Sequence, residues 1–456
     1  MNEYRKRIYL CLAHMSEDGS EQKYVKEAFD TNWVVPLGPN VNGFEQDLES
    51  FVSPDDTNDN SFSSRVVALS AGTAAVHLAL IGCGVGPGDE VCVQSFTFCA
   101  SSNPIKYLGA VPVFVDSEKE TWNMDPDLLE IAIKDRIEKK GRAPKAIIVV
   151  ALYGMPYRID RIMEIADKYG IPVIEDAAEG FGSEFNGRKL GTFGRYGVLS
   201  FNGNKMITTS GGGALICRGK DLDDSSAMWR EMMMYATQYR ESYPYYQHEK
   251  IGYNYRMSNV CAGIGRGQMT VAKDHIAHHR HTAELYENLF KGIPGISFHK
   301  GPEWASLGGN YWLNTITLDT SLIIKGQDDA YKSVVSGAVG GAAGVIHTAD
   351  CPVTDCQPND NVEALRIGLD NAGIEARPVW KPMHRQPVYS IGYAECGLTV
   401  DAHGVKCYEG RESVAYVNGV SEEIFKVGMC LPSGPCVTDD DIAYIVDTIK
   451  NLIVNE

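Results

Sequence analysis

Short apolar runs alternate with helical stretches between about residues 64 and 216. The apolar runs lie at 66–69, 91–93, 111–115, 146–150 and 172–174. Apolar residues recur with helical spacing at 74–81, 101–108 and 159–169. Such alternation predicts an α/β domain with a mostly parallel sheet and helices on both of its faces.

The ends of the predicted strands carry polar or small residues. Residues 71–73, 95–98, Asp176 and Ser200 each follow an apolar run. In an open α/β sheet, ligands bind beyond the carboxyl ends of the strands. We therefore expect these four segments to converge on one ligand site.

The remainder of the chain predicts a second, smaller domain. We expect a large domain over 20–267 and an α+β C-terminal domain over 268–456, with residues 1–19 packing nearby. Helical spacing of isoleucines predicts a terminal helix within 439–453. Three stretches rich in glycine or polar residues are interpreted as surface insertions: 53–64, 326–360 and 396–419.

Charge and composition narrow the class of protein. The 456 residues include 42 Lys and Arg against 59 Asp and Glu, a net charge of -17. This balance argues against a nucleic-acid or an acidic membrane partner. An anionic ligand would therefore have to be held by local groups.

The chain also lacks the patterns of export and of structural metal sites. No apolar run reaches the roughly 20 residues that cross a bilayer, and the first apolar stretch is too short for a signal peptide, so we expect a cytoplasmic protein. The 12 cysteines lie mostly in apolar stretches, which is typical of buried free thiols. None forms a C-x-x-C pair, and no metal site is predicted.

Lys205 and Asp176 are the residue pair that indicates a catalytic site. Lys205 follows Asp176 by 29 positions and precedes the glycine run 211–213. Pyridoxal phosphate needs an amine to hold its aldehyde as a Schiff base and a carboxylate to keep its ring nitrogen protonated. The turn Ser70-Ala-Gly-Thr-Ala-Ala75 could present backbone amides to a phosphate. Each residue alone also fits a structural role, Lys205 on a surface loop and Asp176 as a cap of the next turn.

Neighbouring residues extend this hypothetical site. Phe98 could stack on a flat ring or belong to the core, and Ser200 could donate its hydroxyl to a phosphate. Glu179 lies three positions after Asp176, where it is either near the same site or a solvated carboxylate.

Six ordered motifs then resemble one family, the DegT/DnrJ/EryC1/StrS nucleotide-sugar aminotransferases. The motifs are Ser70-Ala-Gly-Thr-Ala-Ala75, Leu152-Tyr-Gly-Met-Pro156, Glu175-Asp-Ala-Ala-Glu179, Ser200-Phe-Asn-Gly-Asn-Lys205, Gly252-Tyr-Asn-Tyr-Arg-Met257 and Arg377-Pro-Val-Trp-Lys-Pro-Met-His384. The resemblance runs from Asn32 to Gly434. It implies the pyridoxal-phosphate-dependent transferase fold type I, with a seven-stranded sheet in the large domain.

The resemblance also implies roles for single residues. Lys205 is the lysine that binds pyridoxal 5'-phosphate and Asp176 the partner of the ring nitrogen. The other cofactor-binding residues it implies are Gly72, Thr73, Phe98, Glu179, Ser200, Asn202 and Asn254. Family members are dimers, so Asn254 would reach the phosphate of the neighbouring subunit.

The same comparison suggests the sugar substrate. Glu179 after Asp-Ala-Ala is similar to the subgroup that aminates C4 of 4-keto-6-deoxy sugars, and Lys205 speaks against the dehydratases, which carry histidine there. The residues expected to bind the nucleotide sugar are Trp33, Trp312, Arg377, Trp380, Lys381 and His384. Cations and an aromatic ring suit a diphosphate-linked ligand.

The leading hypothesis is therefore a homodimeric transaminase that moves an amino group from L-glutamate to a nucleotide-linked 4-keto-6-deoxy sugar, for surface polysaccharide or amino-sugar synthesis. Two alternatives stay open: other pyridoxal-phosphate chemistry on a nucleotide sugar, such as C3 amination or dehydration, and a catalytically silent, cofactor-binding regulator.

Overall fold

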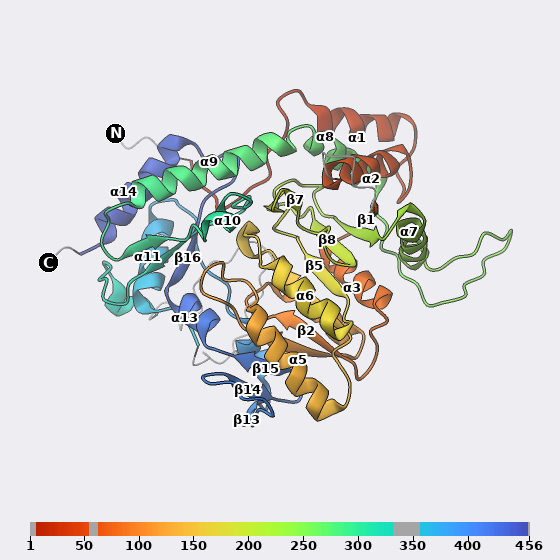
Figure 1. The fold of residues 1–456 in the computed structure, drawn as a ribbon. Coiled ribbons are helices and arrows are strands. Elements are labelled where there is room, and N and C mark those ends of the chain that lie inside the picture. Colours follow the sequence, from red (N-terminus) through yellow and green to blue (C-terminus); the bar gives the residue numbers. More distant parts are fainter. Residues whose placement is uncertain (1–5, 54–62, 332–355, 455–456) are drawn as a thin grey trace.

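A large mixed sheet forms the centre of the molecule (Figure 1). The computed structural model describes residues 6–53, 63–331 and 356–454. In spatial order the ten strands are β1 (Ser63–Leu69), β9 (Gly213–Gly219), β8 (Tyr196–Ser200), β5 (Val173–Asp176), β4 (Ala146–Val150), β2 (Glu90–Gln94), β3 (Val111–Val115), β15 (Val414–Val417), β14 (Lys406–Glu409) and β13 (Ala394–Cys396). The pairings from β8 through β15 are parallel, whereas β9 runs antiparallel to both β1 and β8.

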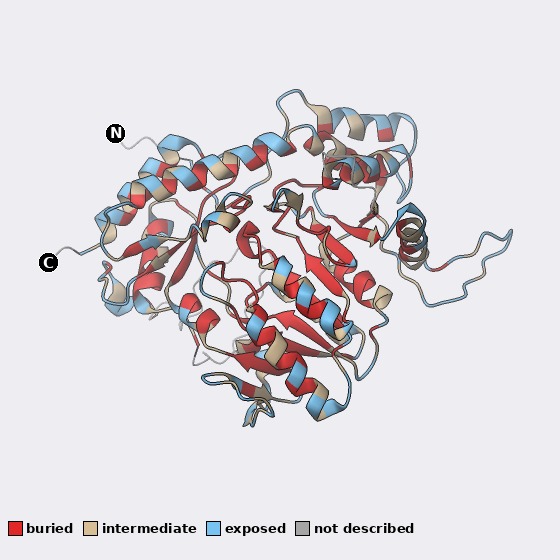
Figure 2. Cartoon of the chain, viewed as in Figure 1, coloured by how far each residue is buried: buried red, intermediate tan, exposed pale blue. Residues whose placement is uncertain are grey.

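Helices cover both faces of this sheet, as the alternation predicted. One face packs against α2 (Pro39–Val52), α5 (Pro126–Lys140) and α6 (Ile159–Tyr169), and the other against α3 (Gly72–Gly82), α4 (Asn103–Tyr107) and α7 (Leu222–Ala236). Alternate residues of β1 point to opposite faces: Val66 and Ala68 join the first core, and Val67 and Leu69 the second. Figure 2 shows the buried strands beside α5 and α6, whose ribbons alternate between buried and exposed residues.

A four-stranded antiparallel sheet forms the centre of a second, smaller core. Its order is β10 (Ile296–Phe298), β11 (Asn314–Leu318), β16 (Gly428–Leu431) and β12 (Arg377–Pro378). Its core includes residues of α9 (Ala272–Phe290), α11 (Asp360–Asn371) and α14 (Asp439–Leu452). The long helix α9 runs from the large sheet toward this region (Figure 1).

Shorter elements complete the described chain. They are the helices α1 (Ser20–Asp30), α8 (Asn259–Met269), α10 (Glu303–Ser306), α12 (Pro387–Ser390) and α13 (Val420–Val427), and the hairpin strands β6 (Glu184–Phe185) and β7 (Arg188–Lys189). Single 3-10 turns lie at Cys99–Ser101, Leu152–Gly154, Gln327–Asp329 and Met383–Arg385. No helix within the described ranges is long and apolar enough to cross a membrane.

The interpretation of 396–419 as a surface insertion is wrong. This stretch contains β14 and β15. The fully buried β15 pairs with β3, and β15, β14 and β13 together extend the expected seven strands to ten. Strands of three or four residues give too short a pattern for the sequence to indicate a sheet partner. Most of the other two proposed insertions, 54–62 and 332–355, lies outside the described residues.

Candidate active site

A cavity of about 1070 Å³ lies at the carboxyl ends of the parallel strands. The four segments expected to converge there all contribute to its lining, with residues 71–73, 97–98, Asp176 and Ser200. Of the predicted site residues, those that line it are Gly72, Thr73, Phe98, Asp176, Glu179, Ser200, Asn202, Lys205, Trp312, Arg377 and Trp380.

Lys205 lies on the loop that joins β8 to β9 and extends into this cavity. Its Nζ donates to Glu179 Oε1 at 3.2 Å and lies 4.0 Å from the centre of the Trp312 ring. The side chain is only 13% exposed. Trp312 is fixed in turn, because its Nε1 donates to the carbonyl of Asn204 at 2.7 Å. The amine is thus held in place and enclosed, as a covalent attachment point requires.

Asp176 ends β5 and is buried against the cavity floor. Oδ2 accepts from the Ser101 hydroxyl at 2.7 Å, and Oδ1 accepts from the Ala178 amide at 3.2 Å. Burial raises the pKa of this carboxyl, while Ser101, Ala178 and the charge of Lys205 act in the opposite direction. A buried carboxylate with spare acceptor capacity favours a cationic partner, and a protonated ring nitrogen is such a partner.

Glu179 lies close to the same lysine. Burial raises its pKa to about 7, although the Lys205 charge and the Tyr153 amide both lower it. The Tyr153 amide donates to Oε2 at 2.8 Å. Tyr153 adopts the left-handed conformation (φ 53°), which is costly for a residue with a side chain. This strained conformation directs the Tyr153 amide N–H at Glu179.

The first turn of α3 offers an anion site. Its N-cap residue Ala71 has no side chain that could accept from the first amides of the helix. Free amides and the helix dipole favour a phosphate at this end. Ser200 lies beside it, since a Cβ on Gly72 would be 3.1 Å from Ser200 Cβ. A Cβ on Gly213 would overlap the backbone nitrogen of Gly72, so glycine there lets β9 approach the turn.

Aromatic rings form part of the cavity wall, which Phe98, Trp312 and Trp380 all line. The Trp380 ring lies 5.5 Å from that of Phe98, 5.3 Å from that of Tyr153 and 6.4 Å from that of Trp312. The amide of Trp380 donates to the Tyr153 hydroxyl at 2.9 Å. Phe98 is 55% exposed, which leaves its ring open to a ligand. This wall suits flat and ring-shaped ligands.

Four predicted residues lie outside the cavity lining. Trp33 and Asn254 are at the surface, and Lys381 is half-buried. His384 is buried: its Nδ1 lies 2.6 Å from Ser95 Oγ and its Nε2 3.1 Å from Glu422 Oε1. The expected substrate hydrogen bond from His384 is therefore taken by protein groups, because the segment turns into the core after Trp380.

Several residues that line the cavity are not predicted from the sequence. They are Arg7, Tyr9, Leu10, Cys11, Leu12, Ser101, Leu313, Glu375 and Cys430, among others. The N-terminal segment reaches the cavity because Ile8 pairs with Ile374 beside β12. No local motif indicates such a long-range bridge, whereas Ser101 follows the Phe98 segment closely enough to have been considered.

The residues present fit pyridoxal phosphate. Lys205 would hold its aldehyde, Asp176 its ring nitrogen, the α3 amides with Ser200 its phosphate, and Phe98 one ring face. These groups line one cavity, and each offers the charge, hydrogen-bonding group or ring face that its counterpart needs. The arrangement can position an amino compound next to an electron-withdrawing ring.

Comparison with known proteins agrees with this arrangement. A crystal structure of a DegT DnrJ EryC1 StrS aminotransferase from Brucella abortus shares the fold, with a TM-score of 0.72, 23% identity and coverage of 95% of both chains. EpsN of Bacillus subtilis (strain 168), described as a pyridoxal phosphate-dependent aminotransferase, is 40% identical over 98% of this chain and 96% of its own. GDP-perosamine synthase of Escherichia coli O157:H7 is 32% identical over 97% and 98%.

Fold and site therefore define a pyridoxal-phosphate-dependent aminotransferase of fold type I. The model of the DegT/DnrJ/EryC1/StrS aminotransferase family matches residues 15–343. The chain belongs to this family, as its motifs predicted.

Proposed function

We propose that this aminotransferase moves an amino group from L-glutamate to the C4 keto carbon of a nucleotide-linked 4-keto-6-deoxy sugar, in the synthesis of a surface polysaccharide or another amino-sugar product. The observation that carries the proposal is the placement of Lys205 between Asp176, Glu179 and Trp312 in a cavity large enough for a sugar nucleotide. The relative named GDP-perosamine synthase, which aligns over nearly its whole length, supports a nucleotide sugar as the substrate. A GDP-linked 4-keto sugar is therefore the first substrate to test.

Bound pyridoxal phosphate supplies an electron-withdrawing ring that stabilises negative charge on the carbon bearing the amine. Asp176 would hold the ring nitrogen and favour its protonated form. Lys205 Nζ takes a proton from the amine-bearing carbon of the donor and returns a proton to C4 of the acceptor. Glu179, with a pKa near neutrality, can accept a hydrogen bond from that ammonium group while it carries the proton.

The outer part of the cavity suits the nucleotide. Arg377 is exposed at the rim, where Glu375 Oε1 accepts from its Nη2 at 2.8 Å. Arg7 and Trp380 also line the cavity. Two guanidinium groups and an indole ring offer contacts to a diphosphate and to a sugar or base face.

The test combines the protein with pyridoxal phosphate, L-glutamate and a panel of GDP-, UDP- and dTDP-linked 4-keto-6-deoxy sugars, and identifies products by mass and NMR. We expect 2-oxoglutarate together with a sugar aminated at C4. Lys205→Ala should lower turnover by about 10³-fold or more, since it loses both attachment and proton transfer. Lys23→Ala, which changes an exposed lysine on α1, is the matched control.

Amination at C3 would contradict the proposed regiochemistry, and loss of the C3 hydroxyl would indicate dehydration instead. Conversion with another amino donor but not with glutamate would contradict the proposed donor. Turnover that survives in Lys205→Ala would contradict the assigned role of the lysine.

A further inference from the structure

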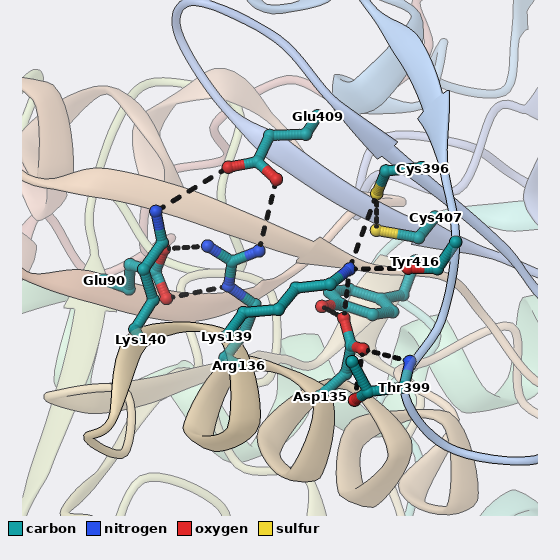
Figure 3. Close-up of polar contacts among 11 residues, drawn as sticks. Glu90, Asp135, Arg136, Lys139, Lys140, Cys396, Thr399, Cys407, Glu409 and Tyr416 are labelled. Carbon is teal, nitrogen blue, oxygen red and sulfur yellow. Dashed lines mark hydrogen bonds and ion pairs between the residues drawn. The ribbon is translucent and has the colours of Figure 1, made fainter.

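A pair of cysteines faces each other on the outer hairpin of the large sheet, away from the cavity lining. Cys396 of β13 and Cys407 of β14 are register partners, and their sulfurs lie 2.6 Å apart (Figure 3). Opposed residues of antiparallel strands have Cα atoms about 4.5 to 5.5 Å apart, a separation that a disulfide spans. The backbone therefore already holds both thiols in position to be joined.

A lysine of α5 extends to this pair. Lys139 Nζ lies 2.9 Å from Asp135 Oδ2, donates to the Gly397 carbonyl at 2.8 Å and lies 3.7 Å from Cys396 Sγ. Figure 3 shows the ammonium group between the carboxylate and the sulfurs. An ammonium group at this distance stabilises the negative charge that develops on the sulfur as it reacts.

The position of Lys139 is itself fixed. Asp135 also accepts from the Thr399 amide at 2.7 Å, from the Thr399 hydroxyl at 2.8 Å and from the Tyr416 hydroxyl at 2.5 Å. These bonds join α5, the loop after β13, and β15. The carboxylate that partly neutralises Lys139 is thus shared among several donors, and the lysine keeps one donor directed at Cys396.

The two thiols differ in their accessibility to solvent. Cys396 is half-buried, on a hairpin whose flanking residues Glu395 and Gly397 are exposed, whereas Cys407 is fully buried. An external reagent therefore reaches Cys396 first. The buried sulfur of Cys407 is then the nearest nucleophile for a second step.

We propose that Cys396 and Cys407 form a redox-active dithiol site that reacts with low-molecular-weight disulfides. The Cys396 thiolate attacks one sulfur of the disulfide, which forms a mixed disulfide and releases one thiolate. Cys407 gives up its proton to the thiolate already released and attacks Cys396 Sγ, which forms the intramolecular bond and releases the second thiolate. In the balance, two protein thiols are oxidised by two electrons and one small disulfide is reduced to two thiols.

The test equilibrates the purified full-length protein with graded ratios of reduced and oxidised glutathione, alkylates the remaining thiols and maps peptides by mass. We expect a cross-linked pair of peptides that contain Cys396 and Cys407 and lack two hydrogen atoms. Cys407→Ala should accumulate a glutathione adduct on Cys396. Cys436→Ser, which changes an exposed cysteine elsewhere, should leave the cross-link unchanged.

Lys139→Gln examines the role of the ammonium group. We expect oxidation of Cys396 to be about three- to tenfold slower, because the positive charge beside the reacting sulfur is removed. Lys134→Gln on the same helix, whose lysine pairs with Glu130, should react at the parent rate.

Three results would overturn the proposal: both thiols still alkylated after equilibration with oxidised glutathione alone, a first adduct on Cys407, or an unchanged rate in Lys139→Gln. The first measurement needs no substitution, so it stands even if a variant does not fold.

Discussion

Glu179 is the residue whose titration the structure makes most accessible to experiment. Its carboxyl is buried beside Lys205 and has a pKa of about 7, well above its ordinary value of 4.5. A raised folded-state pKa means that the folded protein binds more protons than the unfolded chain between these two values. The contribution of Glu179 to stability is then fully present below about pH 4.5 and is lost as pH rises through about 7.

We therefore expect the cofactor-free parent protein to lose stability as the pH rises. The Glu179→Gln variant should not show this loss. Relative to the variant, the parent should lose on the order of 2 to 3 kcal/mol of unfolding free energy between pH 4.5 and 8. Urea unfolding of both proteins across this range measures the difference. Parallel stability curves would show that Glu179 does not titrate in this window.

At the scale of elements, the contact between α3 and β9 decides whether the phosphate end of the site can form. Gly213→Ala places a methyl group against the backbone of Ala71 and Gly72, which cannot move as a flexible side chain would. We expect a stability loss of about 1 to 3 kcal/mol and a rise of about tenfold or more in the Kd for pyridoxal phosphate.

Gly211→Ala is the matched control for this change. Gly211 lies on the same glycine run and lines the cavity, but a Cβ there would meet no atom within 4 Å. Thermal unfolding and spectroscopic titration with the cofactor compare the two variants. Equal affinities would contradict the assignment of the α3 turn as the phosphate site.

A buried ion pair connects α5 to the large sheet. Arg136 is fully buried, and its Nε and Nη2 donate to both oxygens of Glu90 at 2.9 and 2.5 Å (Figure 3). Glu90→Ala would leave the guanidinium buried without its bidentate carboxylate partner, and the contact to the Glu409 carboxylate, at 3.6 Å, is longer. We expect a loss of about 3 kcal/mol or more, measured by denaturant unfolding.

The exposed pair between Lys26 and Asp30 provides the comparison. Asp30→Ala should change stability by less than about 1 kcal/mol, because both partners are solvated. A similar cost for the two substitutions would mean that burial of Arg136 does not govern the energetics.

At the scale of the whole molecule, the loop between α7 and α8 projects from the body (Figure 1). It exposes Tyr243, Tyr245, Tyr246 and Ile251 by 53%, 62%, 80% and 86%. Apolar side chains gathered on a projecting loop indicate a protein interface. The predicted homodimer, in which Asn254 approaches the neighbouring site, would cover them.

Replacing the three tyrosines together by serine should shift the protein toward monomers. If each contributes about 1 to 2 kcal/mol, the dimer Kd rises by about a hundredfold or more, and activity falls at low protein concentration. Sedimentation velocity measures the shift, with Leu307→Ser as a control for loss of an exposed apolar residue elsewhere. An unchanged dimer would exclude this loop from the interface.

The sequence by itself determined the α/β layering and named most of the predicted site residues that line one cavity. Apolar runs and helical spacing are local patterns, and Asp176, Ser200 and the turn at Gly72 each lie at the end of a strand, so their convergence follows from the rule that parallel strands end at one edge. The six motifs also identified the family, because their order and residue types can be recognised in the sequence alone.

Only the tertiary structure decided which distant segments join that framework. The strands at 394–417 complete the sheet, the N-terminal segment borders the cavity, and His384 turns into the core. Each of these depends on pairing between residues hundreds of positions apart, which short strands and single side chains do not encode locally. The juxtaposition of Cys396, Cys407 and Lys139 arises in the same way, from packing of a late hairpin against an early helix.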